Sequence, residues 1–388
     1  MRYELQTKIL KLKREIKYLI PEIAEDIPKE KVLQKWKEYT PQAKKIFAVA
    51  EDGSVNKKQF LGFYLYAVSG YSFGQNDGKN VEEFIGDINI SVIKNTDKAD
   101  SYFRLLMFLS EIKSIVKLAK REKPQLLLID GTLSSKFIIS PPKTDWFSNK
   151  EFGGKLAEIS GFLIDDIIDI LYKEDIASFS YEIKLKAMRL IKDKLQETPR
   201  RDILEAFLSK LAYFEYLLVL YDLFYSLENK PFIIGIAKTS QDTQLFKSAV
   251  PDIRLLHRFV YTLGYTQPLT ISIESKAKEK TQEWEFSEVF EKRKPQIAHA
   301  LKDITIKYFY GKYDSGRTIS VIEVYENPEK ESVNPELILD YLAYLSVGGY
   351  PFFLKKVDKD VRITHKDMQM IIRLLGLDKE LTGREELV

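Results

Sequence analysis

The chain has 388 residues, 45% of them hydrophobic and 30% charged, which is the balance of a globular protein with room for one elaborated domain or two. It contains no cysteine, which excludes disulfides, cysteine-ligated zinc and thiol nucleophiles, and its three histidines, His257, His299 and His365, lie far apart in the sequence. A catalytic metal would therefore be held mostly by oxygen, which favours Mn²⁺ or Mg²⁺ over zinc. The net charge of only +3 implies that any nucleic-acid site depends on local clustering of Lys and Arg.

Neither the start of the chain nor its most apolar run has the pattern of a targeting or membrane segment. Residues 1–4 open a charged helix rather than a signal peptide. The apolar run over residues 211–227 is interrupted by Glu215 and Asp222, which argues against a membrane span. We therefore expect a cytoplasmic protein that does not cross a membrane.

Residues 1–44 predict an N-terminal helical segment ahead of the main domain. A first helix, over residues 1–20, carries apolar side chains spaced alternately four and three apart: Leu5, Ile9, Leu12, Ile16 and Leu19. We expect this helix to pack on its own domain, the alternative being that it meets a partner helix. A second helix is expected over residues 29–39.

A first buried strand is expected over residues 46–51, leading into Asp52-Gly53-Ser54. Two further β-rich runs, 59–70 and 81–93, are separated by a loop rich in Gly, Asn and Asp. Three strands in succession predict an antiparallel meander. An Asp-Gly pair taken singly is as consistent with a turn as with a ligand.

The next helix, over residues 99–121, has Glu111 as its only acid between Ser101 and Lys120. Its neighbours three and four residues away are mostly apolar, so this carboxylate needs either water or a partner such as a metal ion. Residues 125–129 then predict a strand buried on both faces, which ends in Asp130-Gly131-Thr132.

The succession of a strand with an acid, two strands, a helix with an acid and a strand with an acid matches the ribonuclease H-like architecture. We therefore predict an α/β fold with a ribonuclease H-like mixed sheet flanked by helices. The main domain is expected over residues 45–376, with a helical insertion at about 150–228 that covers one side of the sheet. Aromatic residues in the last helix of that insertion are expected in the core.

The remaining chain alternates strands and helices. A buried strand over residues 231–237 is followed by Lys238, and further strands are expected over 267–274, 303–310 and 317–325. Helices are expected over residues 252–261, 334–346 and from Pro351 through Asp358. A capping box of Thr364 and Asp367 starts the final helix, and residues 377–388 form a polar tail.

Five motifs in this order resemble the NurA family, prokaryotic and mainly archaeal nucleases that work with the HerA helicase in DNA end processing. They are Asp52-Gly53-Ser54, the helix with Glu111, Leu128-Ile129-Asp130-Gly131-Thr132, residues 235–240 and Gly349-Tyr350-Pro351. The resemblance implies a Mn²⁺-dependent 5′→3′ DNA exonuclease, also active on single strands, that acts in double-strand break resection and repair. It further implies a homodimer that works with a HerA-type hexameric helicase or translocase.

The resemblance also implies the residues of the site. Asp52, Glu111 and Asp130 correspond to metal ligands, and Tyr350 corresponds to an active-site tyrosine. The family usually has a histidine eight residues past that tyrosine, where this chain has Asp358, which we keep as a fourth carboxylate ligand.

Phosphodiester hydrolysis by two divalent ions, Mn²⁺ or Mg²⁺, about 3.5–4 Å apart gives these residues distinct expected roles. Asp130 would bridge both ions, with Asp52 and Glu111 on one side and Asp358 on the other. Lys238 would hold the scissile phosphate, the alternative being a plain lysine at the end of a strand. Tyr350 would orient substrate or water, the alternative being a packing role.

Two other functions remain open on the sequence. One is an endonuclease or RNA-directed nuclease with the same fold. The other is a non-catalytic or weakly active assembly protein whose acids are structural and whose helices dock a hexameric DNA-translocase ATPase. Replacement of the family histidine by Asp358 adds weight to this last alternative, although the metal-dependent nuclease stays the first hypothesis.

Overall fold

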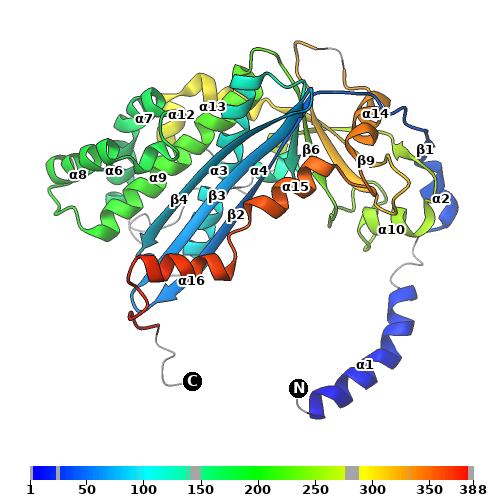
Figure 1. Cartoon of the computed structure of the whole chain (residues 1–388), viewed down its shortest axis with the longest axis horizontal. Helices are drawn as coiled ribbons and strands as arrows, with labels where there is room; N and C mark the ends of the chain where they lie inside the picture. The colour runs from blue at the N-terminus through cyan, green and yellow to red at the C-terminus, as the bar shows by residue number, and fades with distance from the viewer. Residues whose placement is uncertain are drawn as a thin grey trace.

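A single mixed sheet organises the described part of the chain in the computed structural model, which describes residues 3–22, 27–94, 96–137, 139, 150–275, 288–330 and 332–382. Among these residues the sheet has ten strands in the order β1-β7-β9-β10-β6-β5-β2-β3-β4, with β8 paired to β9 (Figure 1). The strands are β1 (Trp36–Glu38), β2 (Ala48–Phe60), β3 (Phe63–Asn76), β4 (Lys79–Ser91), β5 (Leu126–Asp130), β6 (Phe232–Ala237), β7 (Gly264–Thr266), β8 (Leu269–Ser272), β9 (Thr305–Lys312) and β10 (Ser320–Tyr325).

Helices account for most of the remaining described residues, and α1 projects away from the sheet (Figure 1). They are α1 (Tyr3–Glu22), α2 (Lys29–Gln34), α3 (Thr96–Glu122), α4 (Leu133–Lys136), α6 (Lys150–Ser160), α7 (Ile164–Ile170), α8 (Tyr181–Leu195), α9 (Arg201–Tyr221), α10 (Asp252–Phe259), α12 (Glu288–Arg293), α13 (Pro295–Lys302), α14 (Pro335–Leu345), α15 (Phe352–Val361) and α16 (His365–Leu374). None of the described helices is long and apolar enough to cross a lipid bilayer.

The strands β2, β3 and β4 form the expected antiparallel meander, and β2, β5 and β6 then pair in parallel. Because the chain returns to β2 through α3, the parallel strand β5 lies directly beside the first strand of the meander. This mixed sheet with flanking helices confirms the predicted α/β fold, and its strand order is consistent with a ribonuclease H-like architecture.

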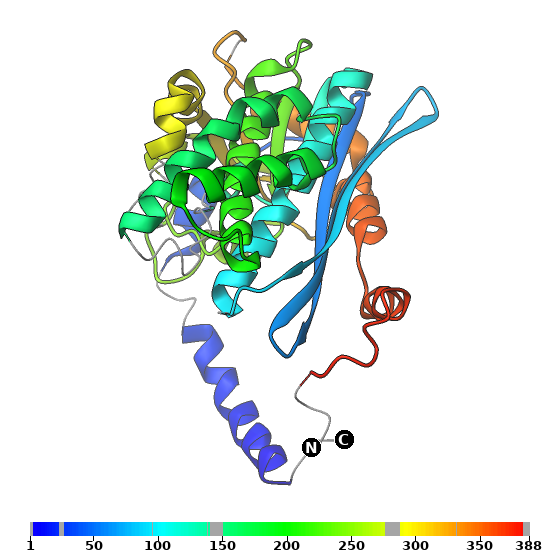
Figure 2. The same cartoon turned by 90° about the vertical axis from the view of Figure 1, so that its left-hand side faces the viewer.

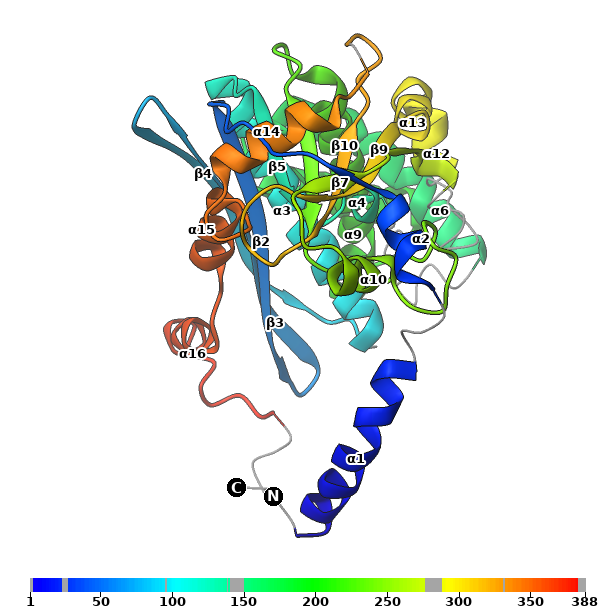
Figure 3. The same cartoon turned by 90° about the vertical axis from the view of Figure 1, so that its right-hand side faces the viewer.

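Strand β5 is buried on both faces, as its run of aliphatic residues predicts. Leu127 and Ile129 enter the core on one face, whereas Leu126 and Leu128 enter the core on the other. The first core is closed by α3 and the helices α6–α9, and the second by α14 and α15 (Figures 2 and 3). The sheet therefore separates two apolar layers, and successive residues of its central strands face different surroundings.

The described helices between Lys150 and Tyr221, where the insertion is predicted, pack mainly on α3, which itself lies on β2 and β3. Within it, the aromatic residues Tyr213, Phe214 and Tyr216 of α9 are buried, as expected of core side chains. Lys113 of α3 and Glu215 of α9 form an ion pair of 2.7 Å with both side chains fully buried. This pair ties the insertion to the helix that carries Glu111.

Some boundaries differ from the sequence prediction. The expected helix over residues 29–39 ends at Gln34, because residues 36–38 instead pair with β7 as strand β1. The first long strand continues to Phe60, so Asp52 and Gly53 lie inside a regular ladder rather than in a turn. The short elements β7, α4, α12 and α13 were not predicted, and residues 1–2 and 383–388 lie outside the described chain.

Two glycines that face each other allow α3 to approach the sheet closely. Gly53 of β2 and Gly70 of β3 are partners in the ladder. A Cβ atom added at Gly70 would lie 2.2 Å from the backbone of Ser110, and one added at Gly53 would lie 2.3 Å from Oε1 of Glu111. The missing side chains at these two positions are therefore required for the observed place of Glu111.

We expect Gly70→Ala to lower the free energy of unfolding by about 3 kcal/mol, because backbone rather than a flexible side chain blocks the added methyl group. Urea unfolding measures this change. The matched control is Gly154→Ala in α6, where nothing lies within 4 Å of the added atom and about 1 kcal/mol of stabilisation is expected. Equal stability of the two variants would contradict the proposed close contact.

Candidate active site

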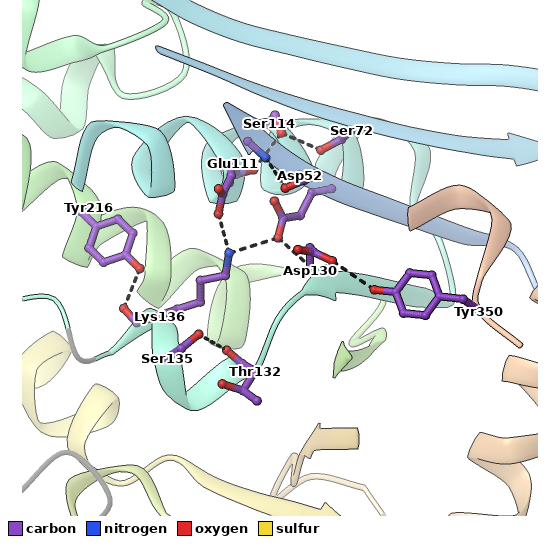
Figure 4. Close-up of polar contacts among 12 residues, drawn as sticks. Asp52, Ser72, Glu111, Ser114, Asp130, Thr132, Ser135, Lys136, Tyr216 and Tyr350 are labelled. Carbon is purple, nitrogen blue, oxygen red and sulfur yellow. Dashed lines mark hydrogen bonds and ion pairs between the residues drawn. The ribbon is translucent and has the colours of Figure 1, made fainter. Parts of the chain in front are cut away.

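Asp52 and Asp130 lie side by side at the end of the parallel strand pair. The register of β2 and β5 aligns Glu51 with Ile129, so each aspartate is the next residue along its strand. Both share the face of Ala48, Ala50 and Leu128, which is the side covered by α14 and α15. The Tyr350 hydroxyl, which precedes α15, donates a hydrogen bond of 3.1 Å to Oδ1 of Asp130 (Figure 4).

Glu111 reaches the same end of the sheet from the opposite face. Its side chain is 3% exposed, crosses Gly53, and receives a hydrogen bond from the ammonium of Lys136. Lys136 ends α4, which begins three residues after Asp130 (Figure 4). The structure therefore brings together Asp52, Glu111 and Asp130, which are far apart in the sequence.

Sequence reasoning missed two charged residues at this site, Glu51 and Lys136. Glu51 is fully buried, accepts a 3.3 Å hydrogen bond from the backbone N–H of Asp130, and lies 3.5 Å from the Lys136 ammonium. The signal for Glu51 is present in the sequence, because a charged residue in a strand buried on both faces requires a partner. Lys136 gave no such signal, since α4 has only four residues and was not predicted.

Burial and mutual repulsion raise the pKa values of the carboxyl groups. Burial first, and then the charges of Asp130 and Glu111, raise the pKa of Asp52 to about 7. Burial also raises the pKa of Glu111 and, most strongly, that of Glu51. For Lys136, burial acts to lower the pKa, but the charges of Glu111 and Glu51 outweigh it and hold the pKa above its usual value. One ammonium thus faces an excess of negative charge.

The carboxylates of Asp52, Glu111 and Asp130 fit a divalent cation that prefers oxygen, although their present positions do not form a complete coordination site. Asp52, Glu111 and Asp130 offer only carboxylate oxygens, and their repulsion is what a bound cation relieves. Among the described residues, no three Asp, Glu or His side chains are positioned to hold one ion as they stand. One of the three carboxylates, that of Glu111, is bound to the ammonium of Lys136.

Asp358 lies on α15 and is engaged by a neighbour. Both of its oxygens accept from Arg362, at 3.0 and 2.7 Å, and its side chain is half-exposed. Ser54 and Asn56, on the same face of β2 as Asp52, hydrogen-bond to Ile363 just past α15, which sets this helix alongside that face. No described contact joins Asp358 to the other three acids.

Lys238 follows β6 and lies over the ring of Tyr350, with Nζ 3.9 Å from the ring centroid. Its cation therefore stands next to the tyrosine that binds Asp130. Two lysines of α15 have partners within the protein: Lys355 donates to the carbonyl of Val347, and Lys356 pairs with Asp360 at 2.6 Å.

Residues 44–363 match the model of the NurA domain. The chain is 27% identical over 363 residues to the DNA double-strand break repair nuclease NurA of Sulfurisphaera tokodaii, which covers 93% of this chain and 91% of that protein. It is 25% identical over 366 residues to the probable DNA double-strand break repair nuclease NurA of Methanocaldococcus jannaschii, with coverage of 91% and 84%.

Solved structures share the fold. The crystal structure of the NurA nuclease from Sulfolobus solfataricus matches with a TM-score of 0.64 and 22% identity over 97% of both chains. The crystal structure of NurA bound to dAMP and manganese matches with a TM-score of 0.65 and 18% identity, over 95% of this chain and 97% of that one.

The raised pKa of Asp52 predicts a pH dependence of stability in chelator. In the folded protein the carboxyl group of Asp52 has a pKa of about 7, whereas its ordinary pKa, expected in the unfolded chain, is 3.8. Between these two pH values the folded protein therefore binds more protons than the unfolded chain. Stability therefore falls as the pH rises from about 4 to 7, by up to about 4 kcal/mol from this group. Asp52→Asn is expected to remove this part of the decline in urea unfolding measured with EDTA.

The control for that measurement is Asp77→Asn, which changes an aspartate whose side chain is 84% exposed. It should keep the slope of the unsubstituted protein. An equally steep decline in Asp52→Asn would show that Asp52 is not the group that titrates.

Proposed function

Because the chain belongs to the NurA domain family, we propose that it is a manganese-dependent DNA nuclease whose metal ligands include Asp52, Glu111 and Asp130. The observation that carries the proposal is that these three acids, supplied by β2, α3 and β5, meet at one end of the sheet. The relatives named above are DNA double-strand break repair nucleases, and one related structure contains dAMP and manganese.

In its finer form, the proposal is a 5′→3′ exonuclease that acts on double-stranded ends and on single strands during end resection. Two Mn²⁺ ions, or Mg²⁺ in their place, would supply the Lewis acidity that activates water and stabilises the leaving oxygen. Asp130, which has Asp52 on the next strand and accepts from the hydroxyl of Tyr350, would hold the ions together with Asp52 and Glu111. Asp358 is the proposed fourth ligand, which requires it to leave Arg362.

Tyr350 and Lys238 have roles that need no metal. The hydroxyl of Tyr350 donates to Asp130 and so fixes the orientation of that carboxylate. Lys238 presents a cation beside the Tyr350 ring, at the edge of a cluster of acids. We propose that this ammonium holds the scissile phosphate, which acids alone would repel.

Asp130→Asn tests the nuclease directly. With Mn²⁺, the unsubstituted protein is expected to degrade linear double-stranded and single-stranded DNA. The variant is expected to cleave more than about 100-fold more slowly, because loss of even an outer-shell partner of a metal lowers activity or metal affinity by about 10–100-fold. Substrates labelled at either end report the polarity, and closed circular DNA and RNA report endonuclease or RNA-directed activity. Asp77→Asn, an exposed aspartate, is the control with full activity expected.

Undiminished cleavage by folded Asp130→Asn would contradict the proposed site. If the unsubstituted protein cleaves none of these substrates and binds no Mn²⁺, the alternative of a non-catalytic assembly protein that docks a hexameric DNA translocase replaces the nuclease.

Helix α1 supports the proposed assembly with other chains. Its apolar residues Leu5, Ile9, Leu12 and Ile16 keep the four-and-three spacing, and all are at least 41% exposed. An amphipathic helix with an exposed apolar stripe is suited to pair with another helix. We propose that it contributes to a homodimer or to the surface that meets a HerA-type helicase.

The double variant Ile9→Glu and Leu12→Glu is expected to weaken that assembly without affecting the nuclease site. Light scattering after size-exclusion chromatography should show a dimer for the unsubstituted protein and a shift toward monomer for the variant. The exposed Lys8→Glu is the control, because it changes charge on α1 but leaves the apolar stripe intact. A dimer that survives the double variant would exclude α1 from the dimer interface.

A further inference from the structure

Lys136 lies between two buried acids, and its single positive charge can neutralise only one of the two carboxylates. Its side chain is 5% exposed, its ammonium binds Oε2 of Glu111, and Oε1 of Glu51 is 3.5 Å away. Both acids are almost fully buried. A buried charge is stabilised only by close pairing, so one ammonium shared by two carboxylates favours one of them at the expense of the other.

Glu51 is the acid with spare hydrogen-bonding capacity. Its Oε1 accepts from the backbone N–H of Asp130 at 3.3 Å. Its Oε2 is buried and has no hydrogen-bond partner among the described residues. A buried carboxylate oxygen without a donor is unfavourable, and the nearest cation with donors to offer is the Lys136 ammonium.

The backbone around Lys136 is held firmly, so a change of partner involves only the end of its side chain. Ser134, at the start of α4, donates from its backbone N–H and its hydroxyl to buried Glu323, at 2.7 and 2.8 Å. The hydroxyl of Tyr216 donates to the carbonyl of Lys136 at 2.7 Å. The ammonium sits on a four-carbon stem that can redirect its three donors over a short distance.

We propose that Lys136 is a positioning residue that holds Glu111 in the metal-free protein and transfers to Glu51 when Glu111 binds a divalent cation. This inference rests on the proposed metal site. It accounts for the contact of Glu111 with Lys136, and it assigns the unpartnered oxygen of Glu51 as the acceptor for the released ammonium. In the metal-free protein Lys136 thereby neutralises the negative charge of Glu111. A divalent cation must then displace the Lys136 ammonium to bind that carboxylate.

The proposal predicts opposite effects on Mn²⁺ affinity for the two partners. Lys136→Met removes the competitor for Glu111 and is expected to raise the affinity about 10-fold, the lower end of the range for outer-shell changes. Glu51→Gln removes the acceptor for the released ammonium and is expected to lower the affinity by a similar factor. Isothermal titration of chelator-stripped full-length protein with MnCl₂ measures both effects without relying on cleavage.

A double variant separates transfer from simple charge effects. If Glu51 acts through Lys136, Glu51→Gln should change the affinity less than about 3-fold in the Lys136→Met background. If the two charges act independently on the cation, Glu51→Gln weakens binding equally in both backgrounds, and the transfer is overturned. Should Lys136→Met fail to fold, Lys136→Gln carries the same expectations.

Lys113→Met is the matched control because it removes another fully buried lysine of an ion pair, that with Glu215. It should lower the melting temperature without changing Mn²⁺ affinity. A change in affinity as large as that of Lys136→Met would reduce the role of Lys136 to general stability. No binding of Mn²⁺ by the unsubstituted protein would instead remove the proposed metal site itself, and with it the transfer.

Discussion

The close contact between α3 and the glycine pair of β2 and β3 is the constraint on which the candidate site depends. Gly53 and Gly70 face each other across the ladder, and their missing side chains make room for the backbone of Ser110 and the side chain of Glu111. A buried hydrogen bond of 2.6 Å between the hydroxyls of Ser72 and Ser114 fixes α3 along the same strand. With α3 any farther from the sheet, Glu111 could not reach past β2 toward the aspartates.

The end of the sheet divides the charged residues into two groups. Because side chains alternate along a strand, Glu51 faces the helical layer together with Glu111 and Lys136, whereas Asp52 faces the layer of α14 and α15 with Asp130. The first group is buried and depends on an internal cation. The second is only partly buried and is bordered by Tyr350 and Lys238. Access for a substrate is therefore expected from the second side.

Two loops late in the chain, at residues 314–316 and 348–349, hold Tyr350 in place on the side of the sheet where Asp52 and Asp130 lie. Gly349, just before Tyr350, has a φ of +85° and donates to Oδ2 of Asp314 at 2.8 Å. A Cβ atom at Gly316 would lie 2.6 Å from Gly349, so the two loops are in direct contact. The placement of the Tyr350 hydroxyl on Asp130 thus relies on a turn that only glycine adopts without strain. The orientation of the Asp130 carboxylate thus depends on a rigid turn that fixes the position of Tyr350.

The sequence alone was sufficient for the features that follow from local pattern. The aliphatic run before Asp130 predicted a strand buried on both faces, and the meander, α3 and the capping box of Thr364 and Asp367 followed from periodicity and turn residues. The order of strands and helices also placed Asp52 and Asp130 on neighbouring strands, because it determines which strand ends lie side by side.

Only the tertiary structure decided the partners of those acids. Glu111 binds Lys136, Glu51 lies near the same ammonium, and Asp358 is bound by Arg362. The contacts of Glu111 and Glu51 with Lys136 join side chains from separate elements, so they depend on how these elements meet in space. The four-residue helix α4 has too few residues for a periodic pattern. Its position is set by long-range contacts: Ser134 donates to Glu323, which is 189 residues away, and Tyr216 donates to the carbonyl of Lys136 from 80 residues away. Periodicity reports which face of an element is buried, but it carries no information on which distant charge completes a buried ion pair.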